Sequence, residues 1–193
     1  MLNIKKRQII KAATQVFAEK GYHDTKIDEI AREADVAKGS VYLYFQSKED
    51  LFIEMMKDGV KRYKDVKISV LEQDLPLYQK LKKMLIEEIE FLWDNQQVAR
   101  FLLTSDIVTQ DTLYNWLLKV RNTFIEKLTS EFDKAIETGD VIAGDSSLYT
   151  RIFRGVEHQV IGYYIIIDGK KPNEEMIDKA LAALTKGIFK ENN

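Results

Sequence analysis

The stretch TKIDEIAREADVAKGSVYLYFQSKEDLF, residues 25–52, decides the fold of this chain. Its first part carries four apolar residues at the i, i+3, i+4, i+7 spacing of one helix face: Ile27, Ile30, Ala31 and Ala34. Residues 35–37 interrupt this spacing, and a second short helix is expected to open at Lys38. Two short helices joined by a tight turn are typical of a helix-turn-helix, which places its second helix in the major groove of DNA.

Capping residues predict where the neighbouring helices begin. Thr25 is a good N-cap for the first helix of the helix-turn-helix. Ser47 with Asp50 forms a capping box for a long helix that follows. Lys48 lies in the first turn of that long helix, where the helix dipole disfavours a cation. Its position makes sense if a phosphate group lies nearby.

The second helix carries side chains suited to DNA. Val41 and Phe45 share a face that can pack inward, which leaves Ser40, Tyr42 and Tyr44 for a different face. Hydroxyl groups, lysines and helix N-termini are the groups that bind phosphate oxygens. We therefore expect this face to contact nucleic acid.

Residues 5–63 resemble the DNA-binding domain of TetR-type transcriptional regulators, over about a third of the chain. The resemblance is carried by Ala12, Ala13, Phe17, Lys20, Gly21, Tyr22, Thr25, Ile30, Ala31, Ala34, Val36, Lys38, Gly39, Ser40, Tyr42, Tyr44, Phe45, Lys48, Glu49, Asp50 and Leu51. It implies an all-helical fold of about nine helices. An N-terminal three-helix DNA-binding domain would precede a C-terminal helical bundle for ligand binding and dimerisation. A helical hairpin without a DNA role is the alternative, and it leaves the lysines and tyrosines of the second helix unexplained.

The DNA-binding residues expected from this reasoning fall into two sets. Lys38, Ser40 and Tyr42, with Gly39 among them, are expected to read the DNA, while Thr25, Tyr44, Lys48 and, more weakly, Tyr22 are expected to hold phosphates. The helix-turn-helix occupies about residues 25–45 of an N-terminal domain over 1–47. The C-terminal domain is expected over 48–193.

Composition agrees with an all-helical protein. The 193 residues are 45% hydrophobic and 31% charged, with only two prolines and nine glycines. Residues 1–47 hold eight Lys and Arg against six Asp and Glu, and the remainder holds 21 against 25. DNA affinity would therefore come from a local face, with an acidic body held away from the phosphates. No apolar run has the length of a membrane span or of a signal peptide, so a cytoplasmic protein without a membrane partner is expected.

Periodicity and turn residues predict the helices on either side. They are expected over about residues 4–20, 48–71, 76–94, 97–107, 111–139, 146–168 and 172–190. Gly21 is expected to end the first of them.

The last two helices are the candidates for self-association. Gly155 and Gly162 lie on one face, and each costs about 1 kcal/mol relative to alanine in a helix interior. A close helix contact would explain them. The next helix has a 4-3-4 seam of apolar residues: Ile177, Leu181, Leu184 and Ile188. Either face can instead pack within one chain, but the family resemblance and the symmetry of DNA sites favour a homodimer.

Large apolar side chains fill the middle helices. An ordinary core explains them residue by residue, whereas the resemblance implies a ligand cavity between these helices. The candidate ligand contacts are Met55, Trp93, Phe101, Trp116, Phe124 and His158. A lone histidine is more often a core or surface residue than a ligand contact. An apolar or amphipathic effector fits such a body.

Enzyme motifs are absent from the sequence. It has no phosphate-binding loop, no G-x-S-x-G and no HExxH, and it lacks cysteine, so neither a cofactor nor a metal site is expected. The chain is expected to be a ligand-responsive DNA-binding regulator, most simply a repressor that binds a palindromic operator as a dimer and is released by a small, largely apolar ligand. The alternatives are a small-molecule binding protein with a vestigial helix-turn-helix, and an all-helical enzyme.

Overall fold

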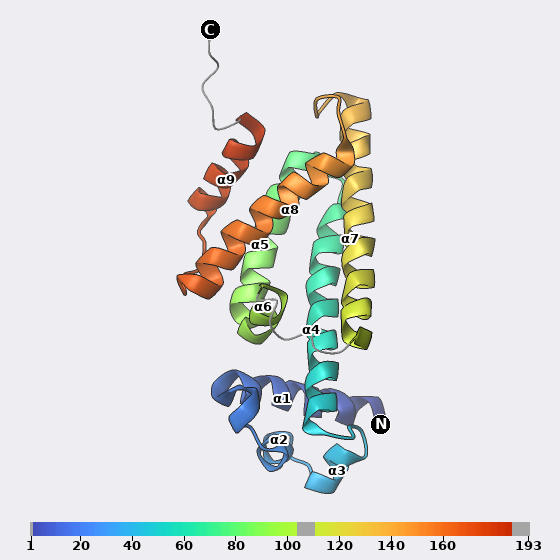
Figure 1. The fold of residues 1–193 in the computed structure, drawn as a ribbon, viewed down its shortest axis with the longest axis vertical. Helices are drawn as coiled ribbons and strands as arrows, with labels where there is room; N and C mark the ends of the chain where they lie inside the picture. Colours follow the sequence, from blue (N-terminus) through green and yellow to red (C-terminus); the bar gives the residue numbers. More distant parts are fainter. Residues whose placement is uncertain (1, 104–110, 187–193) are drawn as a thin grey trace.

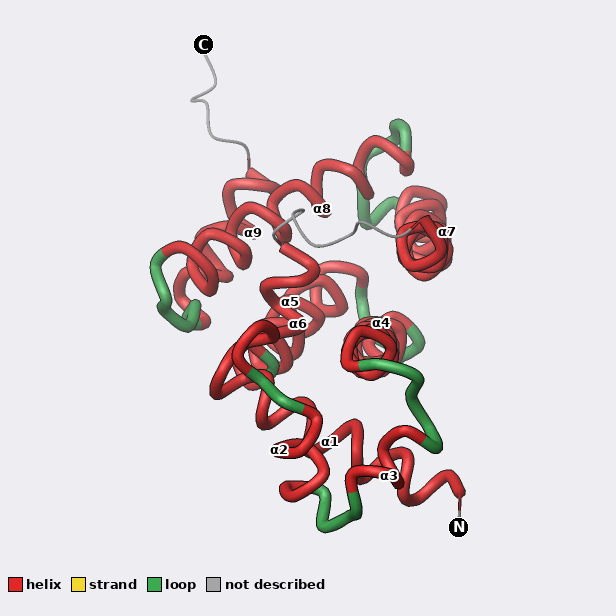
Figure 2. Tube along the Cα trace, turned by 60° about the horizontal axis from the view of Figure 1, so that its bottom comes forward, coloured by secondary structure: helices red, strands yellow, loops and turns green. Residues whose placement is uncertain are grey.

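The computed structural model describes residues 2–103 and 111–186, and all regular structure in these ranges is helical (Figures 1 and 2). The predicted all-helical fold is confirmed. The elements are α1 (Leu2–Asp24), α2 (Ile27–Glu33), α3 (Lys38–Tyr42), α4 (Lys48–Leu71), α5 (Leu77–Asp94), α6 (Gln96–Leu103), α7 (Asp111–Thr138), α8 (Ser146–Gly162), the π-helix η2 (Tyr163–Ile167) and α9 (Glu174–Lys186).

Helices α1, α2 and α3 form a small cluster at one end of the molecule (Figure 1). Ile9, Phe17, Ile30, Val41 and Phe45 are fully buried there, and the helical spacing predicted this for Ile30, Val41 and Phe45. Gly21 breaks α1 with φ 77° and ψ 168°, a backbone conformation that glycine adopts at little cost. It lies where the sequence placed the end of the first helix.

The capping predictions are half right. Asp50 N donates to Ser47 Oγ at 3.0 Å, so Ser47 caps α4. Lys26, and not Thr25, is the N-cap of α2, and its backbone N–H donates to Glu29 Oε2 at 2.9 Å. The Thr25 side chain is used elsewhere, because its hydroxyl donates to the carbonyl of Gly21 at 2.7 Å. Sequence alone did not reveal that competing acceptor.

Helix α4 joins the two parts of the molecule. It packs on α1, α5 and α7, and Figure 1 shows its N-terminal turns beside α1 and its remaining length in the body. Figure 1 shows α4 and α7 running side by side along the long axis, with α8 crossing the body obliquely toward α9. A displacement of α4 in the body would therefore be transmitted to the N-terminal helices.

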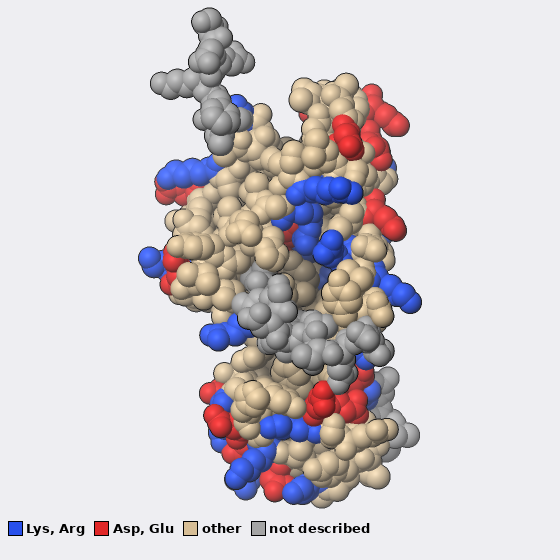
Figure 3. Space-filling model, viewed as in Figure 1, with Lys and Arg blue, Asp and Glu red and all other residues tan. Residues whose placement is uncertain are grey.

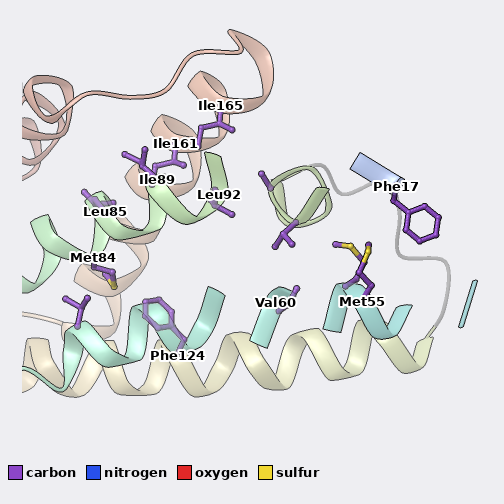
Figure 4. Close-up of a cluster of buried hydrophobic side chains, with 14 of the residues drawn as sticks. Phe17, Met55, Val60, Met84, Leu85, Ile89, Leu92, Phe124, Ile161 and Ile165 are labelled. Atoms are coloured by element: carbon purple, nitrogen blue, oxygen red, sulfur yellow. The ribbon is translucent and has the colours of Figure 1, made fainter. Parts of the chain in front are cut away.

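The apolar core is continuous from the N-terminal helices into the body. Figure 4 shows Phe17 and Met55 near one end, and Leu85, Ile89, Ile161 and Ile165 together in the body. These side chains all belong to one buried cluster. Burial of this apolar surface stabilises both parts and their junction.

Two helix bounds differ from the predictions. The helix expected over about 146–168 ends as α8 at Gly162 and continues as the π-helix η2. The helix expected from about residue 172 starts at Glu174. The predicted ends near residues 107 and 190 lie outside the described residues. Within the described ranges, no helix is both long and apolar enough to cross a membrane.

Candidate nucleic-acid interface and ligand cavity

The surface of α3 is exposed, as a DNA-reading helix requires. Lys38, Gly39 and Tyr42 are exposed, and Ser40 is half-buried. A Cβ atom added at Gly39 would have nothing within 4 Å. Packing within the chain therefore does not require glycine at this position. The open space would admit a DNA backbone.

Leu43 is a candidate that the sequence reasoning missed. It follows α3 directly, and its side chain is 81% exposed, the highest exposure among the large hydrophobic residues described. An aliphatic side chain in such a position can contact the methyl group of thymine. The sequence could have indicated this residue, because it is apolar, lies between the two tyrosines and is not on the inward face that Val41 and Phe45 share.

Lys38 is paired with an acidic neighbour in this structure. Its Nζ lies 2.9 Å from Asp28 Oδ1, and both side chains are more than half exposed. The Asp28 carboxylate raises the pKa of Lys38 through a hydrogen bond and by its charge. An exposed pair of this kind contributes little net stability, so DNA can compete for the lysine.

Lys48 has its ammonium group turned onto the backbone of the first helices. Its Nζ donates to the carbonyls of Tyr22 at 2.8 Å, His23 at 3.2 Å and Thr25 at 3.0 Å. It also lies 4.6 Å from the centre of the Tyr22 ring. The phosphate contact expected of Lys48 stays a prediction, and this geometry gives the residue a structural role that explains a cation in this turn.

Two other expected phosphate contacts are turned inward. The Thr25 side chain is 1% exposed, and its hydroxyl donates within the chain. The Tyr22 ring stacks on Phe17 with 5.8 Å between centroids, and burial raises the pKa of its hydroxyl. Tyr44 is half-buried. The phosphate contacts predicted for these residues are untested. At Thr25 the hydroxyl is already used within the chain, so only the backbone is available for a phosphate contact.

A cavity of about 400 Å³ lies in the body between α4, α5, α6, α7 and α8. That volume is in the range of small-molecule sites. Seven lining residues are mainly apolar, and we call them together the apolar wall: Val60, Leu102, Tyr114, Leu117, Leu118, Val120 and Phe124. The rest of the lining carries titratable groups: Tyr63, Lys64, Lys67, Glu88, Arg121, Arg154, Glu157 and His158. Figure 3 shows Lys and Arg side chains beside a hollow on the visible face of the body.

Four charged residues form what we call the charged floor of the cavity: Lys67 from α4, Glu88 from α5, and Arg154 and Glu157 from α8. Lys67 Nζ donates to Glu157 and lies 3.2 Å from Glu88 Oε2. Arg154 Nη1 donates to the other oxygen of Glu157 at 2.6 Å. The floor therefore links three helices, and its formal charges cancel.

Burial controls the protonation of this floor. It lowers the pKa of Lys67 to about 7, although the Glu88 carboxylate opposes that shift. It also raises the pKa of Tyr63 well above its usual range, so Tyr63 stays protonated and donates to Glu88 Oε1. Burial and the Arg154 guanidinium lower the pKa of His158, which keeps this imidazole neutral near pH 7.

One atom of the floor lacks a hydrogen bond. Glu88 Oε2 is a buried side-chain atom that receives no hydrogen bond from any residue the structure describes. Lys67 Nζ lies 3.2 Å from this oxygen and forms an ion pair with it. The chain encloses the oxygen, so the ion pair supplies its compensating partner.

A second cavity, of about 500 Å³, lies at the end of the body away from α1–α3. It is lined mostly by apolar residues, including Leu77, Leu81, Phe132, Ile142 and Ile152. Asp140 is its only charged lining residue among those described. It is distant from the N-terminal helices and lacks a cluster of buried ionisable groups, so the first cavity is the better candidate for an effector.

The structure separates the expected ligand contacts. Phe124 and His158 line the first cavity. Met55 is in the core, and Trp93 and Trp116 are half-buried elsewhere in the body. The side chain of Phe101 lies outside those described. The sequence analysis favoured aromatic residues and missed Lys67. Its helical spacing from Tyr63 and Val70 could have indicated that Lys67 faces the inside of the body.

The expected dimer contacts are also divided. Ile177 is 4% exposed and Leu181 is fully buried within this chain, so for these two the alternative of packing inside one chain holds. Leu184 is half-buried, and Ile188 lies outside the described residues. Gly155 is exposed, with nothing within 4 Å of an added Cβ, and Gly162 is half-buried. An open glycine on α8 is compatible with contact to a second chain.

Comparison with known proteins places these features in context. Residues 9–55 match the sequence profile of the bacterial regulatory proteins of the tetR family. The whole chain is 27% identical over 192 residues to the fatty acid metabolism regulator protein of Bacillus subtilis (strain 168), with 95% of each chain covered. No group of three or more residues in the described ranges could hold a metal ion.

Solved structures share this fold over nearly its full length. The fatty acid degradation regulator FadR from Bacillus halodurans matches with a TM-score of 0.77 and 26% identity, over 95% of this chain and 96% of that one. The transcriptional regulator FadR from Bacillus subtilis, in complex with stearoyl-CoA, matches with a TM-score of 0.77 and 24% identity, over 95% and 99%. Both similarities include the body as well as the N-terminal helices.

Proposed function

This chain belongs to the TetR family of bacterial transcriptional regulators, and from that premise we propose that it is a dimeric repressor released from a palindromic operator by a fatty acyl-CoA thioester. Members of this family regulate transcription and are not enzymes. The observation that carries the proposal is the cavity of about 400 Å³ between α4 and α8, next to the helices that hold the DNA-binding end.

The DNA-reading role falls to the exposed face of α3. Lys38, Ser40 and Tyr42 reach base edges or nearby phosphates, and Gly39 admits the DNA backbone. Tyr44 and the chain around Thr25 approach the flanking phosphates. A local reading face of this kind is in keeping with a net charge of −2, because only this end of the molecule needs to attract DNA.

The effector class rests on the lining of the cavity and on the relatives. The apolar wall from Val60 to Phe124 suits an acyl chain, and Lys64 and Arg121 add positive charge that suits the phosphates of coenzyme A. The Bacillus subtilis relative is a fatty acid metabolism regulator, and stearoyl-CoA occupies the FadR structure from that organism. The largely apolar ligand expected from the sequence matches only the apolar wall, and not the charged residues of the lining.

Helix α6 is suited to carry the signal. Leu102 of α6 lines the cavity, and Gln97 of the same helix donates to the carbonyl of Phe17 in α1 at 3.2 Å. Val98 packs on Gly59 of α4. A ligand that displaces α6 would alter its contact with α1 and its packing on α4, the helix that joins the body to the DNA-binding end. It would then shift the population between two dimer geometries, provided its affinity differs between them.

Dimerisation is assigned to the exposed stripe of α8. Leu148, Ile152, Gly155 and Gln159 recur at i, i+4, i+7, i+11 and are all exposed. Large apolar residues in such a stripe, without cover from their own chain, are typical of protein interfaces. A twofold pair would present two α3 helices to the halves of a palindrome.

The proposal is tested by DNA selection followed by release. Purified protein is incubated with a random duplex pool at moderate salt, and the retained DNA is sequenced. We expect a palindromic motif whose complex dissociates when hexadecanoyl-CoA, but not coenzyme A alone, is added. Failure of a folded, dimeric protein to enrich any motif would instead favour a small-molecule binding protein with a vestigial helix-turn-helix.

A further inference from the structure

A carboxylate and an ammonium group lie side by side on the end of the molecule that carries the helix-turn-helix. Lys38 is the first residue of α3, and its Nζ lies 2.9 Å from Oδ1 and 3.2 Å from Oδ2 of Asp28 in α2. Both side chains are more than half exposed. Figure 1 shows α2 and α3 together at the end of the molecule remote from α9. DNA phosphates would repel a carboxylate at this end, so its presence there requires a reason.

The stability of the fold does not supply that reason. The capping carboxylate of α2 belongs to Glu29, whose Oε2 accepts from the backbone N–H of Lys26. Asp28 lies in the first turn of α2, where the helix dipole favours an anion, but this effect does not direct its side chain toward α3. An exposed ion pair contributes little net stability. What the pair does fix is the position of the Lys38 ammonium group.

The pair presents a donor and an acceptor to solvent at the same time. An ammonium group has three N–H donors, so contact with Asp28 leaves Lys38 two of them. A carboxylate accepts through two oxygens and several lone pairs, so Asp28 can accept from a second partner as well. In a helix-turn-helix the first residues of the second helix contact base edges. Lys38 has this position, and Asp28 lies next to it.

One base pair matches this arrangement in the major groove. Guanine presents two neighbouring acceptors, N7 and O6, and cytosine presents the donor N4. O6 and N4 are hydrogen-bonded to each other in the base pair, which places them about 3 Å apart. Lys38 Nζ and Asp28 Oδ1 have the same spacing, 2.9 Å. An adenine–thymine pair would offer the lysine only thymine O4, beside a methyl group, in place of the two acceptors of guanine.

We propose that Asp28 and Lys38 act as a unit that reads one G·C base pair in each half of the operator. Lys38 donates to guanine O6 and N7, Asp28 accepts from cytosine N4, and the contact between the two side chains is kept. The Asp28 carboxylate also repels phosphates, which directs the lysine to the base and not to the DNA backbone. This inference rests on the proposed operator binding, and it adds a specificity residue from α2 to the reading face of α3.

Altered bases test the two contacts separately with wild-type protein. Each base pair of one operator half, obtained by DNA selection, is replaced in turn by the other three, and binding is measured by fluorescence anisotropy. At the G·C pair that the unit reads, 7-deazaguanine removes N7, and N4-methylcytosine blocks the free hydrogen on N4. Both altered bases still pair normally. Each should weaken binding about fivefold or more, as expected for the loss of a hydrogen bond to a charged group.

Substitutions assign each contact to its residue. Asp28→Ala should reduce the effect of N4-methylcytosine to less than about twofold, and Lys38→Met should do the same for 7-deazaguanine. Both side chains are exposed, so both variants should fold. Asp28→Ala should also bind unrelated DNA more tightly than wild type, because one anion is removed. The matched control is Asp35→Asn, which removes the same charge from the same surface hollow. It should keep both base sensitivities.

The outcomes separate this inference from the function it rests on. If the protein enriches a motif in which no G·C pair shows both sensitivities, the paired reading is wrong and the regulator function stands. Sensitivity to N4-methylcytosine that survives Asp28→Ala, or that is also lost in Asp35→Asn, overturns the inference as well. If folded protein enriches no motif, operator binding itself is wrong, and the paired reading fails with it.

Discussion

At the scale of single residues, Lys48 shows how a local pattern can have two physical explanations. A cation in the first turn of α4 is disfavoured by the helix dipole, and a bound phosphate would compensate for it. In the structure three backbone carbonyls compensate instead. Neither the chain positions nor the residue types of Tyr22, His23 and Thr25 could show that their carbonyls converge.

Lys48→Ala separates these roles. Loss of three charge-assisted hydrogen bonds should lower the free energy of unfolding by about 1–3 kcal/mol. If the carbonyls alone account for Lys48, the slope of log affinity for the operator against log salt should not change, because no phosphate contact would be lost. Urea unfolding and salt titrations measure the two effects. A slope reduced by about one, with stability unchanged, would instead establish a phosphate contact.

Leu43 makes a prediction about DNA sequence preference. If its exposed side chain contacts a thymine methyl, Leu43→Ala should weaken operator binding about fivefold, in line with the loss of one buried methylene-sized contact. Replacing the contacted thymine by deoxyuridine should weaken wild-type binding but not binding of the variant. Ile142→Ala is the control, since Ile142 is 79% exposed and lies in the body. Equal sensitivity of both proteins at every thymine would rule out this contact.

At the scale of helices, the junction of α4 and α6 depends on a glycine. A Cβ at Gly59 would lie 2.5 Å from Val98 Cγ2, closer than real contacts allow. The sequence shows only a glycine inside a helical pattern, which by itself costs about 1 kcal/mol relative to alanine. The tertiary contact explains why glycine is present despite that cost. Without a side chain at position 59, α6 can lie against α4 between the cavity and α1.

Substitutions at this junction should be strongly coupled. Gly59→Ala should destabilise the protein by about 1–2 kcal/mol, since overpacking outweighs the gain in helix propensity. In a Val98→Ala background the clash is removed, so Gly59→Ala should stabilise by about 1 kcal/mol. Urea unfolding of the four proteins completes the cycle. Additive effects would show that the two residues do not share a contact in solution.

At the scale of the whole molecule, the stripe on α8 predicts the oligomeric state. Ile152→Glu places a charge in the proposed interface, so it should convert the dimer to a monomer and abolish cooperative binding to both operator halves. Light scattering with size-exclusion chromatography measures the mass. Tyr114→Glu is the control, because Tyr114 on α7 is 52% exposed, Ile152 is 44% exposed, and Tyr114 does not line the second cavity as Ile152 does. A dimer that survives Ile152→Glu would place the interface elsewhere.

The sequence by itself determined the helices, the helix-turn-helix and the family. These features depend on interactions between near neighbours, such as the apolar spacing of Ile27, Ile30 and Ala31, the Ser47 cap and the break at Gly21. Local periodicity and capping can be read without knowledge of the fold.

Only the tertiary structure decided which residues meet across helices. It placed Lys67 against Glu88 and Glu157, turned Lys48 onto the first helices and buried Leu181 in its own chain. Each of these outcomes joins groups far apart in the sequence, and the energy of a buried charge depends on its partners and its solvent exposure. The helical pattern marks an inward position, but the three-dimensional packing determines what lies opposite it.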